Sequence, residues 1–554
     1  MHDEALFPQR SPGKSMRPPP AGPWMPGPVR HDESSSVTAR PFSSAHRLPA
    51  IACVLLGAAA ACGFAPLDLW PIALACFAGW MALVHAAPGF RTALWRGWLF
   101  GLGHFTVNNN WFQHAFDFQD AMPPVLGYFA AVALALYLAL FPMVAAGIAW
   151  RLRGRVPDAA FVLVFATAWI ATEYLRAVLF TGYAWDPLAV LWIPVLPIAW
   201  VAAWVGTYAL SGLTIVVAGA LLMAARRRWR LPAVVGGALV AILAIGMLAP
   251  APPPAPAALD APRVRVVQPN IDNNQRANAS EQSLRALIAL SGRPGPAPRL
   301  VVWPEGLVVD FLESGYPDYV YGDRRPFGLR SRIADVLGPR DLMMTNAPRL
   351  FFDADGSIAA AANSVLAIGP DAQIRGRYDK AHLVPYGEYL PMPWLLKPLG
   401  LARLVPGDMD FSPGPGPRAL DWPGFGPVGV QVCYEIVFSG QVVDRAHRPR
   451  LLFNPSNDAW FGSWGPPQHL AQARLRAIEE GLPIVRATPT GISAIIAADG
   501  ALLASVPHET AGAIERPVPP PLPPTLFARV GNAMAAIVAA LLFATAVAIR
   551  RRAV

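Results

Sequence analysis

Long apolar runs separated by short polar segments fill the first 250 residues of the chain. The runs lie at about 48–66, 69–87, 97–116, 123–150, 159–180, 199–224 and 232–249, and one more lies near the C-terminus at 530–549. A helix of about 20 apolar residues has the length to cross a bilayer. We therefore predict eight transmembrane helices. The third run ends in Asn108 to Asn110, which at that depth require protein or water partners instead of lipid.

From residue 263 the pattern changes to short β-branched runs that end in polar or Gly/Pro turns. They read VRVVQPNI, RLVVWPEG, DLMMTNAPRLFF, SVLAIGP, GPVGVQVCYEIVF, RLLFNPSNDAWF, PIVRAT and GISAIIAADG. Helix-like stretches, SEQSLRALIALSG and PQHLAQARLRAIEEG, lie between some of them. Strands that alternate with helices indicate a layered α/β domain, which places its chemistry at strand ends.

The remaining segments define the domain boundaries that we predict. Residues 1–46, rich in Pro, Ser and Arg, are expected to be a disordered cytoplasmic tail, followed by seven transmembrane helices within 47–249. The α/β domain spans 263–515, between Pro-rich linkers at 250–262 and 516–529. The eighth transmembrane helix, 530–549, and a short cytoplasmic tail, 550–554, complete the chain.

Composition and charge support a membrane protein and predict its orientation. The chain is 54% hydrophobic and 15% charged, and a soluble protein carries about 25% charged residues. Basic residues gather in alternate loops, such as RRRWR at 226–230, and acidic residues such as Asp68 and Asp117 occupy the loops between them. By the positive-inside rule the basic loops are cytoplasmic and 250–529 lies on the outer side. The net charge of +9 thus reflects topology, and we expect no nucleic-acid partner.

Of the four cysteines, only Cys433 lies in the C-terminal half. Cys53, Cys62 and Cys76 belong to apolar runs near the N-terminus, so Cys433 has no evident disulfide partner. Taken alone, its run QVCYEIVFSG is typical of a buried strand with a small packing thiol. The alternative is that Cys433 is a nucleophile, and the chemistry of the other predicted site residues decides between the two.

Three polar stretches offer chemistry at predicted strand ends or loops. Glu305 follows a strand in WPEG, Lys380 and Glu388 belong to YDKAHLVPYGEYLP, and Asp458 belongs to NPSNDAWFG. Taken singly, each is more typical of a turn or a surface loop. Together with Cys433 they supply a thiol nucleophile, a carboxylate that can carry its proton, and an ammonium that can stabilise a tetrahedral oxyanion.

The motifs WPE, K-x-H-L-V-P-Y-G-E, C-Y-E and S-N-D-A-W-F-G, in this order, resemble the nitrilase superfamily. This resemblance implies an αββα sandwich with a Glu–Lys–Cys triad. The fusion to eight membrane helices resembles the apolipoprotein N-acyltransferase family, and EYLRAVLFTGYAW at 173–185 is similar to a segment which that family carries. The likeness covers about 48–550.

The resemblance implies a role for each matching residue. Glu305 is expected to be the general base, Lys380 the oxyanion-stabilising residue and Cys433 the nucleophile. Five further positions are expected to support the site or bind substrate: Glu388, Tyr434, Glu435, Asn363 and Trp185. No cofactor and no metal is implied, since His382 and His469 are isolated in the sequence.

Two positions depart from the family pattern. Ala277 stands where the family commonly has a Trp, which leaves a lid or substrate contact in question. Pro489, in RATPTG, stands where nitrilase-like chains usually have Asn, so we expect an altered loop behind the cysteine.

The implied reaction takes an acyl chain from a membrane phospholipid, through a thioester on Cys433, to the amino group of diacylglyceryl-cysteine on an apolipoprotein. We expect a monomer in the bacterial inner membrane with its catalytic domain in the periplasm. Two other readings stay open. A membrane-anchored amidase or nitrilase would use water as the acceptor, and a transporter or receptor would use the outer domain only to bind a ligand. The few intramembrane charges, with Glu173 beside Arg176, speak against a transporter.

Overall fold

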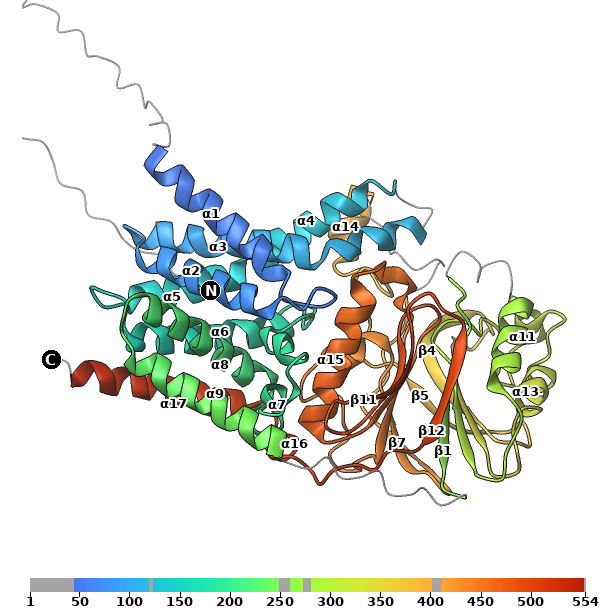
Figure 1. Cartoon of the computed structure of the whole chain (residues 1–554). Coiled ribbons are helices and arrows are strands. Elements are labelled where there is room, and N and C mark those ends of the chain that lie inside the picture. The colour runs from blue at the N-terminus through green and yellow to red at the C-terminus, as the bar shows by residue number, and fades with distance from the viewer. Residues whose placement is uncertain (1–43, 119–122, 249–259, 273–279, 401–409, 553–554) are drawn as a thin grey trace, which may run out of the picture. The chain divides into compact units, whose positions relative to one another are not determined.

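Each of the predicted apolar runs contains a helix in the computed structural model, which describes residues 44–118, 123–248, 260–272, 280–400 and 410–552 (Figure 1). The helices are α1 (Ser44–Ala61), α2 (Trp70–His85), α3 (Phe90–Asn108), α4 (Leu126–Leu138), α5 (Leu140–Arg151), α6 (Ala159–Val178), α7 (Leu196–Ala199), α8 (Ala202–Ala225), α9 (Arg230–Leu248) and α17 (Ala533–Arg551). The predicted tail 1–46 falls mostly outside the described residues, and α1 already begins at Ser44.

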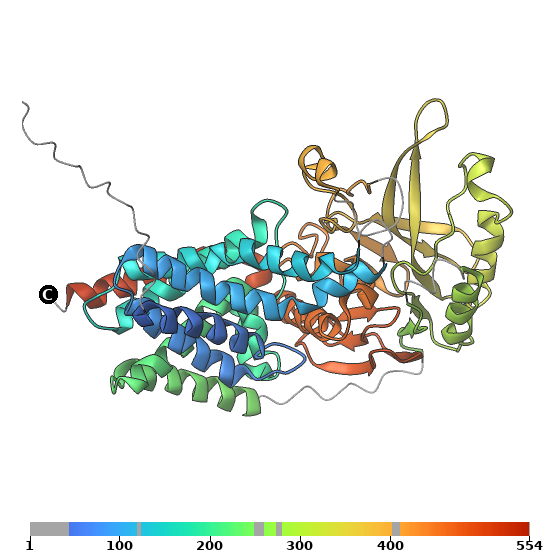
Figure 2. The same cartoon turned by 90° about the horizontal axis from the view of Figure 1, so that it is seen from above.

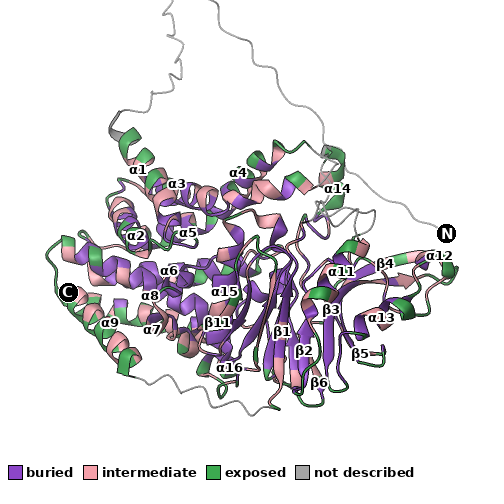
Figure 3. Ribbon diagram, turned by 45° about the vertical axis from the view of Figure 1, so that its right-hand side comes forward, coloured by how far each residue is buried: buried purple, intermediate pink, exposed green. Residues whose placement is uncertain are grey.

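Within the described residues, five helices are long and apolar enough to cross a membrane. They are 126–151, where α4 and α5 run on as one helix, and α6, α8, α9 and α17. Two shorter apolar helices cover 47–61 and 70–85. No residue of α9 is fully buried, and Figure 3 shows the helix in the colours of intermediate and exposed residues. Its Leu231, Val235 and Leu239 pack against the other helices, whereas Val234, Val240 and Ile245 are exposed.

The third predicted run begins and ends earlier than expected. Its helix α3 ends at Asn108, and the following residues form the 3-10 helix η1 (Asn110–Phe118). The asparagines therefore cap a helix end and bond to protein. The Asn108 amide donates to Asp186 Oδ2 at 2.9 Å, and the Tyr183 hydroxyl donates to Asn109 Oδ1 at 2.7 Å.

Two six-stranded sheets form the α/β domain. The first has the order β12-β1-β2-β3-β4-β5 and the second β11-β10-β9-β8-β7-β6. The strands are β1 (Arg263–Gln268), β2 (Arg299–Val302), β3 (Leu342–Phe352), β4 (Ile358–Ile368), β5 (Ile374–Asp379), β6 (Ala419–Trp422), β7 (Gly426–Val430), β8 (Leu451–Pro455), β9 (Ile484–Ala487), β10 (Ser493–Ile496), β11 (Leu502–Val506) and β12 (Gly512–Pro517). Parallel strands lie at the centre of each sheet, and the long antiparallel β3–β4 hairpin (yellow) projects from the first sheet in Figure 2.

The sheets pack face to face between two helical layers, which confirms the predicted αββα sandwich. Helices α11 (Ser280–Ser291) and α13 (Pro326–Ala334) cover the first sheet, and α15 (Gly465–Glu480) covers the second (Figure 1). Val266, Val302 and Val430 belong to the apolar core between the sheets. Because both faces of the sheets are covered, the central strands read as near-continuous apolar runs.

Helix α15 also contacts the membrane helices, so the second sheet is layered between the first sheet and the helical part. Glu479 on α15 accepts hydrogen bonds from the backbone N–H and the hydroxyl of Thr207, at 2.5 and 2.6 Å. The preceding Gly206 has φ of 79°, a left-handed conformation that interrupts α8 and frees this N–H. A Cβ at Gly206 would lie 2.3 Å from the ring of Phe527, so glycine is also required for packing.

Two predicted elements are corrected by the structure. The run QVCYEIV is not a strand: β7 ends at Val430, and Cys433–Val437 form the 3-10 helix η4. The predicted linker 516–529 includes the end of β12 and the short helix α16 (Leu526–Val530), which begins because the Thr525 hydroxyl accepts from the N–H of Ala528 at 2.9 Å. Most of the linker 250–262 lies outside the described residues.

Candidate active site

The predicted triad residues follow three different strands. Glu305 lies in the turn after β2, Lys380 directly follows β5, and Cys433 begins η4 just after β7. β2 and β5 belong to the first sheet and β7 to the second, so the sandwich brings these strand ends together across its core. All three side chains are buried.

Lys380 lies between two carboxylates. Its Nζ is 2.9 Å from Glu388 Oε1 and Oε2, and 3.5 Å from Glu305 Oε1. Burial alone would lower the pKa of Lys380, but the negative charges of Glu388 and Glu305 outweigh it and hold the pKa above its ordinary value. The lysine is therefore a fixed ammonium, which suits it to stabilise an anion and makes it a poor proton acceptor.

Asn363, on β4, connects the two carboxylates. Its Nδ2 donates to Glu305 Oε1 at 2.7 Å and to Glu388 Oε1 at 2.9 Å. Asn346, on β3, donates in turn to Asn363 Oδ1 at 2.5 Å and accepts from the N–H of Gly306 at 2.8 Å. Asn346 is absent from the residues predicted from the sequence. Its signal was an Asn within the apolar strand run DLMMTNAP, where a buried amide needs partners.

Glu435 ties the cysteine turn to the lysine loop. One of its oxygens accepts from the Tyr378 hydroxyl and from the N–H groups of Ala381 and His382, at 2.8, 2.7 and 3.0 Å. The other accepts from the N–H of Val432 at 2.6 Å. The cysteine turn is thus held from the loop that carries Lys380, which explains why a carboxylate follows Cys433 so closely in sequence.

Cys433 has φ of 51°, a left-handed backbone conformation that is uncommon for a non-glycine residue. Burial and the charge of Glu305 raise the pKa of its thiol well above the ordinary value, although Lys380 acts in the opposite direction. The thiol is hence protonated at neutral pH, so it needs a base at the moment of attack. Glu305 lies close to it: its Oε2 accepts from the N–H of Asn457 at 2.8 Å, and that same N–H bonds to the thiol.

Tyr434 and Trp185 lie where the site meets the membrane helices. The Tyr434 hydroxyl donates to the carbonyl of Gly182 at 3.3 Å. The Trp185 indole N–H donates to Gln468 Oε1 at 2.9 Å, and its ring centroid lies 5.2 Å from that of His469. Both predicted residues thus face the junction of the α/β domain with the helical part.

A buried group behind the cysteine comprises His469, Asp458 and Arg486. The Arg486 guanidinium bonds to Asp458 Oδ1 and Oδ2 at 2.7 and 2.6 Å. Burial would raise the pKa of Asp458, but the Arg486 charge overrides it and lowers the pKa. The Nε2 atom of His469 lies 3.2 Å from the Cys433 carbonyl oxygen, and its Nδ1 atom lies 3.0 Å from both Asp458 Oδ1 and Arg486 Nη2. In the sequence His469 stands isolated, because its partners Asp458, Arg486 and Cys433 come from other elements.

The two departures from the family pattern have different outcomes. Pro489 lies in the loop after β9, and its carbonyl accepts from the N–H of Asn270 at 2.8 Å. The loop is therefore tied to the end of β1. Ala277 lies outside the described residues, so the contact in question is not described.

The arrangement suits covalent acyl chemistry. Glu305 can move a proton, Cys433 can attack a carbonyl, and Lys380 can stabilise the oxyanion that forms. In the part of the chain that the structure describes, no three His, Cys, Asp or Glu side chains are grouped to hold a metal ion. All four cysteines are free thiols.

The αββα sandwich and its buried site define the class of this protein: a nitrilase-fold domain joined to a set of apolar helices. The family model for carbon-nitrogen hydrolase matches residues 337–521, and the model for the N-terminal domain of apolipoprotein N-acyltransferase matches 56–220. The chain belongs to the apolipoprotein N-acyltransferase family.

Relatives of that name match almost the whole chain. The protein from Rhodopseudomonas palustris is 33% identical over 89% of this chain and 93% of its own length. Those from Bradyrhizobium diazoefficiens and Caulobacter vibrioides are 32% and 34% identical, covering 91% and 87% of this chain and 95% and 90% of theirs. Among solved structures, a Nesterenkonia amidase of the nitrilase superfamily is 17% identical, covering 50% of this chain and 97% of its own, with a TM-score of 0.33.

Proposed function

We propose that this chain transfers an acyl chain from a membrane phospholipid to the N-terminal amino group of diacylglyceryl-cysteine on apolipoproteins. The observation that carries the proposal is a buried thiol, Cys433, with a fixed ammonium and a carboxylate beside it, in a chain whose relatives are apolipoprotein N-acyltransferases. In this proposal Cys433 is the nucleophile, Glu305 the general base and Lys380 the oxyanion-stabilising residue.

The membrane arrangement is part of the proposal. Eight helices, α1, α2, α3, α4 with α5, α6, α8, α9 and α17, cross the inner membrane, and both termini are cytoplasmic. The basic loops, such as 226–230, support this orientation because they fall on one side. The α/β domain, 263–515, then works at the periplasmic face as a monomer.

In the first half-reaction the Cys433 sulfur attacks the ester carbonyl of the phospholipid while Glu305 takes the thiol proton. The carbonyl oxygen becomes an oxyanion that Lys380 stabilises. When the tetrahedral species collapses, the ester C–O bond breaks, and Glu305 returns the proton to the leaving alkoxide. The products are an acyl thioester on Cys433 and a lysophospholipid.

In the second half-reaction the amino group of diacylglyceryl-cysteine attacks the thioester. Glu305 takes a proton from the nitrogen, the C–S bond breaks, and the proton returns to the Cys433 sulfur. The product is an amide on a triacylated lipoprotein. Glu388 and Asn363 hold Lys380 and Glu305 in place, and Glu435 holds the cysteine turn, so these three act as supporting residues.

Both substrates carry lipid chains, so a site at the membrane surface brings them together without a search through solution. Tyr434 and Trp185 lie at the junction with the membrane helices, which supports an acyl chain entering from that side. A water-using hydrolase would need no such junction, and a ligand-binding receptor would need no reactive thiol.

The experiment that tests the proposal uses the full chain in phospholipid vesicles with a radiolabelled acyl chain. We expect label to appear first as a hydroxylamine-sensitive thioester on Cys433, and then on a diacylated lipopeptide as a hydroxylamine-resistant amide. Cys433→Ala should lose both signals. Cys76→Ala, which alters another buried thiol, should retain both. Label that leaves as free fatty acid with a lipopeptide present would establish a hydrolase and overturn the proposal.

A further inference from the structure

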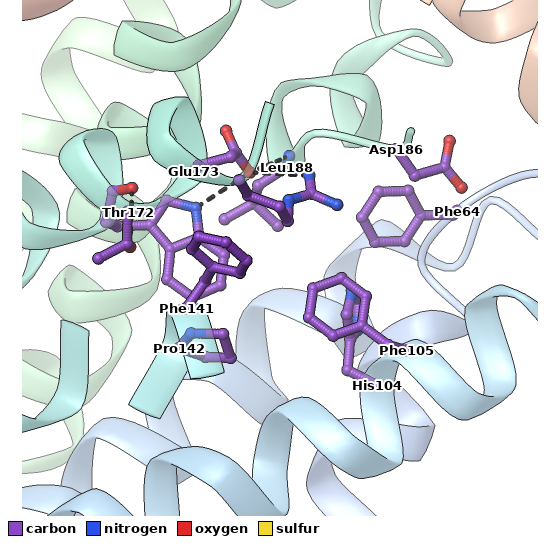
Figure 4. A pocket seen from close by; sticks show the side chains of 11 residues that line it. Phe64, His104, Phe105, Phe141, Pro142, Thr172, Glu173, Asp186 and Leu188 are labelled. Atoms are coloured by element: carbon purple, nitrogen blue, oxygen red, sulfur yellow. Dashed lines mark hydrogen bonds and ion pairs between the residues drawn. The ribbon is translucent and has the colours of Figure 1, made fainter. Parts of the chain in front are cut away.

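A small cavity lies between the apolar helices, and none of the three triad residues lines it. Its lining comes from the loop between α1 and α2, from α3, α5 and α6, and from the segment that follows α6. Phe64, Phe105, Phe141 and Trp169 supply apolar walls, and His104, Glu173, Arg176 and Asp186 supply polar ones. Figure 4 shows Glu173, Asp186 and His104 around this space. The cavity measures about 20 Å³.

Three polar atoms on this lining have no hydrogen-bond partner among the residues that the structure describes. They are Nδ1 of His104, Oε2 of Glu173 and Oδ1 of Asp186. The residues are 5%, 4% and 3% exposed, so no bulk solvent satisfies these atoms. A buried polar atom without a partner costs about 1–3 kcal/mol. Three such atoms on one small cavity therefore indicate that something in the cavity bonds to them.

The second carboxylate oxygens of Glu173 and Asp186 are already engaged. Glu173 Oε1 accepts from the N–H of Leu188 at 2.9 Å and from the Trp169 indole at 3.2 Å. Asp186 Oδ2 accepts from Asn108 at 2.9 Å. The free oxygens of Glu173 and Asp186 thus belong to carboxylates that are otherwise held in place, so rotating either side chain would break an existing bond.

We propose that this cavity holds one resident water molecule. The water donates its two hydrogens to two of the three free acceptors and accepts from the Arg176 guanidinium, which lines the same space. One water needs a cavity of about 10–15 Å³, counted as the space open to a water-sized sphere, and a buried water needs two to four polar partners. Both conditions are met.

A water fits this site better than a cation does. Arg176 already brings a positive charge to within 3.9 Å of Glu173 Oε1, which disfavours a second cation there. Apolar rings form much of the wall, and the volume excludes a lipid headgroup or any larger polar ligand. The ligand class is therefore a single neutral hydrogen-bonding molecule.

The water completes the fixation of the segment that carries Trp185. Arg176 donates to the Trp185 carbonyl at 2.8 Å, and the N–H of Asp186 donates to Gln472 on α15 at 3.1 Å. The residues around the water therefore contact the α/β domain through α15. Without the water, the carboxylates of Glu173 and Asp186 beside this contact would each keep an oxygen without a hydrogen-bond donor.

A map of the full chain in lipid nanodiscs, at a resolution that shows ordered waters, tests the proposal. We expect one peak within about 2.7–3.2 Å of at least two of the three free acceptors. An empty cavity overturns the proposal. A peak with shorter contacts of about 2.3–2.6 Å, which strengthens when sodium salts are replaced by calcium salts, indicates a cation and also overturns it.

Substitutions of the residues that line the cavity give a second test of the proposed water. Glu173→Gln keeps the shape and offers an N–H in place of Oε2, so the water can reorient and the peak should persist. His104→Phe removes a partner and keeps the ring packing against Phe100, so the peak should weaken or shift. Thr172→Val is the matched control, because the Thr172 hydroxyl on the same lining already donates to the carbonyl of Ala168 at 3.0 Å. The control should leave the peak unchanged.

Discussion

The Nε2 atom of His469 lies 3.2 Å from the backbone oxygen of Cys433, and its Nδ1 atom lies 3.0 Å from Asp458 Oδ1. A carbonyl oxygen only accepts, so Nε2 carries the hydrogen. The imidazole thus holds the carbonyl of a residue whose φ is 51°. We infer that His469 is a positioning residue, which keeps the cysteine backbone in its left-handed conformation and thereby directs the thiol.

His469→Leu should slow acylation of Cys433 about tenfold or more, since a lost buried hydrogen bond of about 1–3 kcal/mol translates into that range of rates. His469→Gln can still donate toward the carbonyl and should recover part of the rate. The measurement is single-turnover thioester formation with labelled phospholipid. His447→Gln, on an exposed loop, is the control and should match wild type. If Leu and Gln variants lose only thermal stability, with equal acylation rates, the positioning role is wrong.

The pH dependence of thiol alkylation follows from the raised pKa of Cys433. Burial and Glu305 favour the neutral thiol, so the thiolate fraction at pH 7 is smaller than that of a free cysteine. The rate of reaction with iodoacetamide should therefore keep rising with pH across the neutral range and reach no plateau there.

Removing the charge of Lys380 gives a second test of the raised pKa of Cys433. Lys380 lowers the pKa of Cys433, so Lys380→Met should raise that pKa further and slow alkylation at every pH. Mass spectrometry of the peptide that contains Cys433 measures the rate, and Cys433→Ala defines the background from the other thiols. A plateau reached near pH 6 would show instead a preformed thiolate.

Glu435→Gln should destabilise the protein and slow acylation together. The carboxylate accepts from Tyr378, Ala381, His382 and Val432, whereas Gln has one acceptor oxygen and turns an N–H₂ toward donors. Each buried donor left without a partner costs about 1–3 kcal/mol.

The midpoint of thermal unfolding in detergent and the single-turnover acylation rate measure the two effects of Glu435→Gln. Glu509→Gln, an exposed carboxylate of the same domain, makes the same chemical change and should leave both unchanged. An unaltered midpoint for Glu435→Gln would contradict the bracing role.

Much of the fold and the central residues of the site were predictable from the sequence, for local reasons. The apolar runs and the β-branched runs are properties of continuous segments, and Glu305, Lys380 and Cys433 lie in short motifs with distinctive neighbours. The helices α11 and α15 and the strands β1 and β8 occur where these patterns indicated them.

The elements that were missed depend on contacts between distant segments. Asn346 serves the site only because β3 pairs with β4, which places it beside Asn363. The turn at Cys433 has an apolar β-branched sequence, and Glu435 bonds to the lysine loop and overrides that preference. His469 meets Cys433 only when α15 packs on the second sheet. No local pattern contains this information.

Trp185→Phe tests whether the junction with the membrane helices matters for transfer. The change keeps an aromatic ring against His469 and removes the indole N–H that donates to Gln468. Gln468 still accepts from Trp111 at 3.1 Å, so the loss is one hydrogen bond, worth about 0.5–1.5 kcal/mol of stability. We expect a small fall in the unfolding midpoint and a larger effect on the KM for phospholipid than on kcat, because the segment positions the domain against the membrane part. Trp98→Phe removes a comparable indole bond, to the Leu136 carbonyl at 3.2 Å, at an exposed place and is the matched control. Equal shifts in both variants would mean that the Trp185 bond contributes stability alone and that the junction does not govern access of the lipid.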